Sequence, residues 1–109
     1  MPSAVNYDTN DMRVLGIETS CDESAVALVE NEGDALRILK NAVASQVMIH
    51  RQYGGVVPEV AAREHVRTLP ALIRSEGIKS EEVDLIAVTV GPGLVTALRV
   101  GIDTARTLS

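Results

Sequence analysis

The chain has 109 residues, of which 46% are hydrophobic and 2% aromatic, and its formal net charge is −5. This length and composition suit one small domain with an aliphatic core, and they favour a layered α/β structure over an all-β sandwich. Cys21 is the single cysteine, which excludes an internal disulfide and a zinc site of the Cys-x-x-Cys type. The acidic balance gives no overall attraction for a nucleic-acid backbone. There is neither a signal peptide nor an apolar run near the ~20 residues of a membrane span, so we expect a cytoplasmic protein without membrane contact.

The first part of the chain is predicted to form a three-stranded meander. The polar residues 1–12 are interpreted as an N-terminal extension outside the folded domain. From Arg13, the apolar runs RVLGIE and AVALVE flank the polar segment TSCDES, which predicts two antiparallel strands joined by a tight loop. A turn at 31–34 and a weak alternation over Ala35–Ser45 predict the third strand.

A loop and a long helix are predicted next. Met48–Val57 contains paired glycines and is interpreted as a loop, and Pro58 suits the first turn of a helix that ends near Gly77. Pro70 is expected to kink this helix because it removes a hydrogen bond to the Val66 carbonyl. The apolar stripe of the helix recurs at helical spacing and consists of Ala62, Val66, Leu69 and Ile73.

The last third of the chain predicts a strand and a second helix. After a short helical turn at 80–82, the run DLIAVTV at Asp84–Val90 is typical of a central strand that is covered on both faces. Gly91-Pro92-Gly93 ends this strand, and a second helix follows to the end of the chain. The predicted order is β-β-β-α-β-α.

Three segments are candidates for a functional site. Gly16–Ser24 places hydroxyls, backbone amides and carboxylates at a hairpin tip, where they could hold phosphate, a metal or water. His50–Glu59, with Arg63–His65, brings a Gly-Gly loop to a helix start. Gly91–Gly93 lies at the carboxyl end of a strand, where ligands bind in open α/β sheets.

Each of these segments also has a purely structural interpretation. On spacing alone, a polar turn is the favoured interpretation of Gly16–Ser24. The segment His50–Glu59 could be an ordinary connection between a strand and a helix, and Gly91–Gly93 could be a tight turn that uses glycine for its backbone angles. His50 and His65 lie fifteen positions apart, unlike a helical metal pair, and are expected to be structural. No single segment identifies a reaction.

Together, the segments VLGIETSCDES, HRQYGGVVPEVAAREHV and VTVGPGLVTALRVG resemble the bacterial tRNA threonylcarbamoyl transferase family, TsaD, formerly called glycoproteases. The resemblance covers Met12–Ser109, and YGGVVPE is its most specific part. It implies an actin-like ATPase fold with two ribonuclease-H-like lobes, of which residues 13–109 would be an incomplete first lobe. It also implies transfer of threonylcarbamoyl from threonylcarbamoyl-adenylate to N6 of the adenosine beside the anticodon, in tRNAs that read codons beginning with A.

The resemblance implies roles for particular residues. Asp22 and Glu23 would be catalytic carboxylates near the phosphate of the adenylate or of an ATP-like nucleotide. The phosphate and adenylate contacts would come from Thr19, Ser20, Gly91 and Gly93. The family's iron or zinc ligands, a His-x-x-x-His pair, are expected shortly beyond Ser109, so the chain would hold no metal and would be inactive alone.

The implied partners are tRNA and two proteins, a TsaB-like and a TsaE-like subunit. The acidic charge is consistent with this, because other parts of the assembly could hold the RNA. Two alternatives stay open. The chain could be a non-catalytic TsaB-like subunit that dimerises through this lobe, although such subunits lack YGGVVPE. It could also be a sugar or acid kinase of the same fold, although those carry an Asp-x-Gly-x-Thr/Ser turn where this chain has Glu18–Ser24.

Overall fold

The computed structural model describes residues 12–109. The predicted extension therefore lies outside the described residues, except for Met12, which is the first residue of the first strand. The elements in chain order are β1 Met12–Glu18, β2 Glu23–Glu32, β3 Ala35–Ser45, α1 Val47–Arg51, α2 Pro58–Ser75, the 3₁₀ turn η2 Ser80–Glu82, β4 Leu85–Val88 and α3 Val95–Leu108. The predicted order is confirmed, with one short additional helix before α2.

The strands form a four-stranded sheet in the order β3-β2-β1-β4. β2 is antiparallel to both β1 and β3, as the predicted meander requires, whereas β4 is parallel to β1. Gly33 closes the β2–β3 hairpin with a φ of +60°, a conformation that glycine adopts without the steric cost of a Cβ atom. Because β4 is parallel to β1, the carboxyl ends of these two strands meet at one edge of the sheet.

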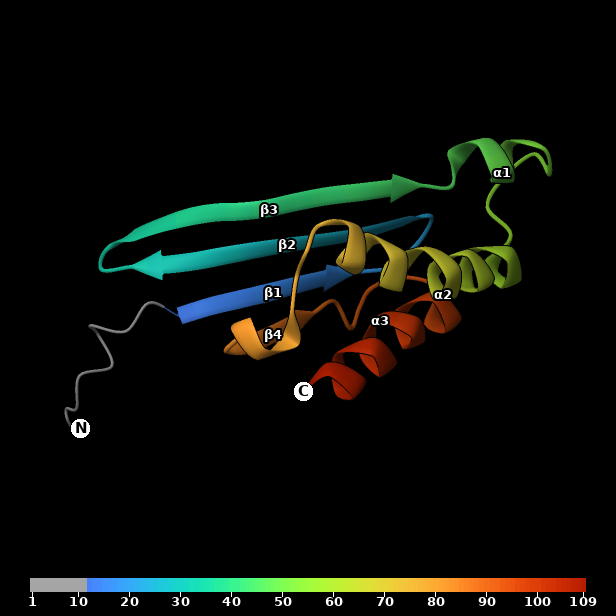
Figure 1. The fold of residues 1–109 in the computed structure, drawn as a ribbon. Helices are drawn as coiled ribbons and strands as arrows, with labels where there is room; N and C mark the ends of the chain where they lie inside the picture. Colours follow the sequence, from blue (N-terminus) through green and yellow to red (C-terminus); the bar gives the residue numbers. More distant parts are fainter. Residues whose placement is uncertain (1–11) are drawn as a thin grey trace.

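The core lies between one face of the sheet and the helices α2 and α3, which both cover that face (Figure 1). Leu15 and Ile17 of β1 pair across the sheet with Leu28 and Val26 of β2, and all four side chains are buried. Alternation of buried and partly exposed residues along both strands turns one side of each strand toward the helices. Leu69 of α2 completes the centre of this core.

The helix α2 begins and ends where the sequence predicts. Pro58 occupies the first turn, where its missing N–H leaves no bond unmade. At the other end, Gly77 has a φ of +70°, and the N–H of Ile78 reaches back to the Ile73 carbonyl at 3.2 Å. α2 continues through Pro70, which is exposed, so water can satisfy the Val66 carbonyl.

Three structural predictions were wrong. Most of α1 lies in the predicted loop Met48–Val57. This helix forms because its first backbone hydrogen bonds go to the Gln46 carbonyl, ahead of the paired glycines. Leu69 and Ile73 of the predicted stripe are buried, but Val66 is 61% exposed, because the first half of the buried face runs through Ala61 and His65, one position before Ala62 and Val66. A buried histidine in the stripe is what shifted the apparent periodicity.

The third correction concerns β4. It is an edge strand of this sheet, and Leu85 is 53% exposed. Among residues 12–109, helices cover only one face of the sheet, so Ile86 and Val88 pack inward while Leu85 and Ala87 face outward.

No helix in this part of the chain is long and apolar enough to cross a membrane.

Candidate functional site

The candidate site is the turn Thr19–Asp22, which follows β1 and lies against the loop that follows β4. Backbone bonds join the two segments: Thr89 N–H donates to the Ile17 carbonyl at 3.1 Å, and Leu94 N–H donates to the Ser20 carbonyl at 2.8 Å. The first and third candidate segments of the sequence are therefore neighbours at one sheet edge. This edge is where ligands bind in open α/β sheets.

Of the two glycines predicted to bind phosphate, only Gly93 lies tightly against the turn. A Cβ atom at Gly93 would lie 2.5 Å from the Ser20 carbonyl oxygen and 2.7 Å from the Ser20 Cβ, so the close approach requires glycine. A Cβ atom at Gly91 would meet nothing within 4 Å. The close approach therefore explains the glycine at position 93 but not the one at position 91.

Thr19 lies in a different place from the one expected of a phosphate contact. Its side chain is 0% exposed, and its hydroxyl donates to the Ala97 carbonyl at 2.7 Å and accepts from Gly101 N–H at 3.2 Å. Gly101 lacks the Cβ that would otherwise lie 2.7 Å from this hydroxyl oxygen. Thr19 therefore fixes the turn to α3, because its hydroxyl points into the protein.

Ser20 is held by a carboxylate that the sequence did not single out. Its backbone N–H donates to Glu18 Oε1 at 3.0 Å, and its hydroxyl donates to Glu18 Oε2 at 2.7 Å. Glu18 ends β1 directly after the apolar run Val14–Ile17, and that contrast is the signal that could have identified it.

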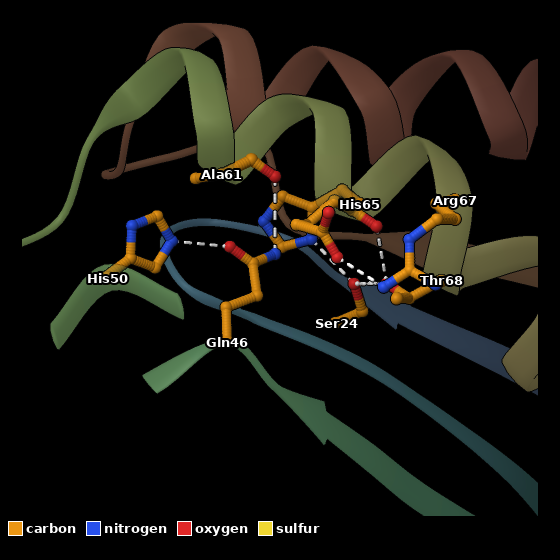
Figure 2. Close-up of polar contacts among 8 residues, drawn as sticks. Ser24, Gln46, His50, Ala61, His65, Arg67 and Thr68 are labelled. Carbon is orange, nitrogen blue, oxygen red and sulfur yellow. Dashed lines mark hydrogen bonds and ion pairs between the residues drawn. The ribbon is translucent and has the colours of Figure 1, made fainter. Parts of the chain in front are cut away.

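His65 of α2 holds the next residue of the turn. Its Nε2 lies 2.8 Å from the Cys21 carbonyl, which can only accept, so Nε2 carries a proton. In the neutral ring, Nδ1 then accepts from the Ser24 hydroxyl at 2.7 Å, and Ser24 in turn lies 2.9 Å from the Thr68 hydroxyl (Figure 2). Ser24 is in phase with the buried Val26 and Leu28 of β2, which is the sequence signal for this polar contact within the core.

The turn is thus fixed at three successive carbonyls. Ser20 accepts from Leu94, Cys21 from His65, and Asp22 from the backbone N–H of Gln46 at 2.9 Å. The Asp22 side chain is half-buried and Glu23 is exposed, so both predicted catalytic carboxylates lie within reach of a ligand. A rigid backbone that carries accessible carboxylates is suited to hold water or a cation beside an anionic substrate.

The residues described here do not fit a metal centre. In the stretch 12–109, no three His, Cys, Asp or Glu side chains gather as a metal site would require. His65 bonds to Cys21 and Ser24, and His50 uses both ring nitrogens on Gln46 and Val57. The ring nitrogens of both histidines are therefore engaged within the protein.

An ion pair joins β1 and β2 at the end of these strands that is remote from the Thr19–Asp22 turn. Arg13 Nε donates to Glu30 Oε2 at 3.0 Å, and this hydrogen bond raises the pKa of Arg13 above its usual value. The contact of Arg67 with Glu64 at 2.6 Å likewise raises the pKa of Arg67. Both guanidinium groups therefore stay charged across the whole range in which proteins fold.

The sheet order, the crossover through α2 and the turn after β1 define a class of fold: a ribonuclease-H-like lobe of the actin-like ATPases. The protein YeaZ from Pseudomonas aeruginosa has a similar structure, with a TM-score of 0.57 and 26% identity over 89% of this chain and 38% of that chain. The similarity is one of fold, and the residues of the turn decide what the lobe does.

Sequence comparison identifies the family. The profile of TsaD, tRNA N6-adenosine threonylcarbamoyltransferase, matches residues 37–109, and this chain belongs to that family. Proteins of that name are 55% identical over 100 residues in Prochlorococcus marinus strain AS9601 and 54% identical over 104 residues in Brucella abortus strain S19. These matches cover 88% and 90% of this chain but 28% and 29% of the relatives, so the chain spans under a third of their length.

Proposed function

We propose that this chain forms the first lobe of a tRNA-modifying transferase. The reaction moves threonylcarbamoyl from threonylcarbamoyl-adenylate to N6 of the adenosine next to the anticodon, in tRNAs that read codons beginning with A. The observation that carries the proposal is the turn that presents Asp22 and Glu23, pressed against the Gly93 loop in a chain that matches this family.

In the proposed reaction, the N6 amine attacks the carbamoyl carbon, a new C–N bond forms, and the C–O bond to the adenylate phosphate breaks. The proton that the amine loses passes to solvent water, and AMP leaves. Asp22 faces the phosphate through an ordered water, since direct contact between two anions is repulsive. By fixing that water, the turn stabilises the charge on the departing phosphate.

The family's iron or zinc would be held outside this segment. The residues described here do not fit such a site, so we assign no step of the reaction to the metal. The part of the reaction that belongs to this lobe is the positioning of the adenylate phosphate.

The partners of the proposed enzyme are tRNA, a TsaB-like subunit and a TsaE-like subunit, in the cytoplasm where tRNA is modified. An apolar cavity of about 560 Å³ between α2, α3 and β4 is the surface we assign to the TsaB-like subunit, which would have a lobe of the same fold. Val66 is exposed at its edge, and apolar surface of this kind marks interfaces. Val66→Asp should weaken binding of that subunit in a pull-down, whereas the matched exposed change Arg63→Asp, outside the cavity lining, should not.

The test of the activity uses a full-length family member that carries residues 12–109 of this chain. Asp22→Asn preserves the shape of the side chain and removes its charge, and the loss of one such electrostatic group costs a factor on the order of 100 to 1,000 in turnover. The matched control is Asp34→Asn, the same change in the exposed β2–β3 turn. Modified nucleoside is measured by mass spectrometry of digested tRNA. Full turnover of a normally folded Asp22→Asn enzyme would show that the turn is only structural.

The alternative is a non-catalytic TsaB-like subunit, and its support is limited to the similarity in fold to YeaZ. The same experiment separates the two functions. In a non-catalytic lobe, Asp22→Asn would leave modification unchanged, while Val66→Asp would abolish it through loss of assembly.

A further inference from the structure

Gln46 connects the Asp22 turn with the second candidate segment. Its backbone N–H donates to the Asp22 carbonyl at 2.9 Å, and its side chain is 2% exposed. The side-chain amide donates to the Ala61 carbonyl of α2 at 3.3 Å, and its oxygen lies 2.7 Å from His50 Nε2 (Figure 2). A single buried residue thus contacts the turn, α2 and α1.

His50 extends this connection to the glycine-rich loop 52–57. Its Nδ1 accepts from Val57 N–H at 3.1 Å, so the neutral ring carries its proton on Nε2 and donates to Gln46. Its backbone carbonyl accepts from Tyr53 N–H at 2.9 Å and from Gly55 N–H at 3.3 Å. Ring and backbone of one buried residue therefore hold both ends of the loop.

Within the described part of the chain, the loop also has two short-range backbone bonds of 3.2 Å, from Gln52 N–H to the Ile49 carbonyl and from Gly54 N–H to the Arg51 carbonyl. Tyr53 is 61% exposed, residues 54–56 are also exposed, and Gly54 has a φ of +80°. Its position therefore depends on hydrogen bonds to His50 rather than on burial of apolar side chains. A displacement of the loop that keeps these hydrogen bonds moves His50 and, through it, Gln46, whose N–H donates to the Asp22 carbonyl.

From these contacts we infer that His50 and Gln46 are positioning residues that couple the loop 52–57 to the Asp22 turn. The inference rests on the proposed function of the turn. It assigns the YGGVVPE segment a part in the reaction: a substrate group that contacts the loop sets the position of the Asp22 carboxylate. His50 itself touches no reacting atom.

The experiment uses two conservative variants in the full-length enzyme described above. His50→Gln places a donor near the Nε2 position and loses the bond to Val57, whereas His50→Asn places an acceptor near Nδ1 and loses the bond to Gln46. Each variant breaks the connection at a different point, so both should lower kcat, by roughly 10- to 100-fold for a displacement of the order of 1 Å. Met48→Gln, an exposed change in the same helix, should leave kcat unchanged.

Two readouts distinguish coupling from general destabilisation. Amide hydrogen exchange of the peptide that covers residues 19–24 should become faster in both His50 variants, although these residues are remote in sequence. In a double-mutant cycle, His50→Asn should cost less than about threefold in an Asp22→Asn background, because both changes act through one group.

Unchanged exchange in the turn, or losses that multiply fully in the cycle, would overturn the inference. The exchange measurement does not depend on catalysis. If Asp22→Asn is silent but exchange in the turn responds to His50, the proposed function fails while the physical coupling stands.

Discussion

Replacing Gly93 by alanine tests whether the two loops must approach as closely as the structure shows. The new Cβ would lie 2.5 Å from the Ser20 carbonyl oxygen, whereas ordinary contacts begin at 3.4 Å. Because the opposing atom is backbone, either the turn or the loop must move by about 0.9 Å, and crowding of this kind costs about 1–3 kcal/mol. The Leu94–Ser20 hydrogen bond, 2.8 Å long, would lengthen at the same time. We therefore expect a loss of roughly 2–4 kcal/mol in the free energy of unfolding.

The assay is a urea titration of the full-length protein that carries this segment, with turnover measured alongside. A displacement near 1 Å at the Asp22 turn should also lower turnover by up to about 100-fold. Gly91→Ala is the matched control for stability, because its Cβ meets nothing within 4 Å. Equal stability of Gly93→Ala and the unaltered protein would refute the close approach, and equal damage from Gly91→Ala would refute the assignment to Ser20.

Three further predictions follow from contacts of the described residues. Thr19→Val keeps the shape of the side chain but removes both buried hydrogen bonds of the hydroxyl, to the Ala97 carbonyl and from Gly101 N–H, and should cost about 1–3 kcal/mol of stability in a urea titration. Thr107→Val, on the exposed side of the same helix, is its control. Glu30→Gln should lower the melting temperature measurably, because it removes the charge that pairs with Arg13; an unchanged melting temperature would show that the pair contributes nothing. The 109-residue chain alone should self-associate in size-exclusion chromatography with light scattering, because Leu36 and Ile38 of β3 and Leu85 of β4 are exposed; a monomer with a sharp thermal transition would contradict this.

The local structure was predictable where side-chain chemistry and periodicity agree. RVLGIE and AVALVE pair as predicted, and Pro58 begins α2, because apolar alternation and the proline geometry act within a few residues. Glu30 is the counterexample. Nothing in its local sequence marks it, yet it is buried in phase with Val26 and Leu28 and paired with Arg13.

The site was predictable only in outline. The Asp22 side chain is half-buried and Glu23 is exposed, but the residues that hold their turn come from α2, α3 and the segment before α1. His65 and Cys21 are 44 positions apart, and no local pattern links a buried histidine to a particular carbonyl. Thr19 was misplaced for the same reason, since its partners Ala97 and Gly101 belong to a helix at the other end of the chain.

The mixed sheet has a consequence for the order of folding. Glu18 pairs with Ala25, 7 positions later, whereas Val14 pairs with Leu85, 71 positions later. Loop-closure entropy makes the second contact about 2 kcal/mol more expensive than the first. The β1–β2–β3 hairpins should therefore form early, and β4 should join after them. Substitutions in β2 would then mainly slow folding, and those in β4 would mainly speed unfolding. In this order of folding, the contact between Ser20 and Gly93 is completed only in the last stage.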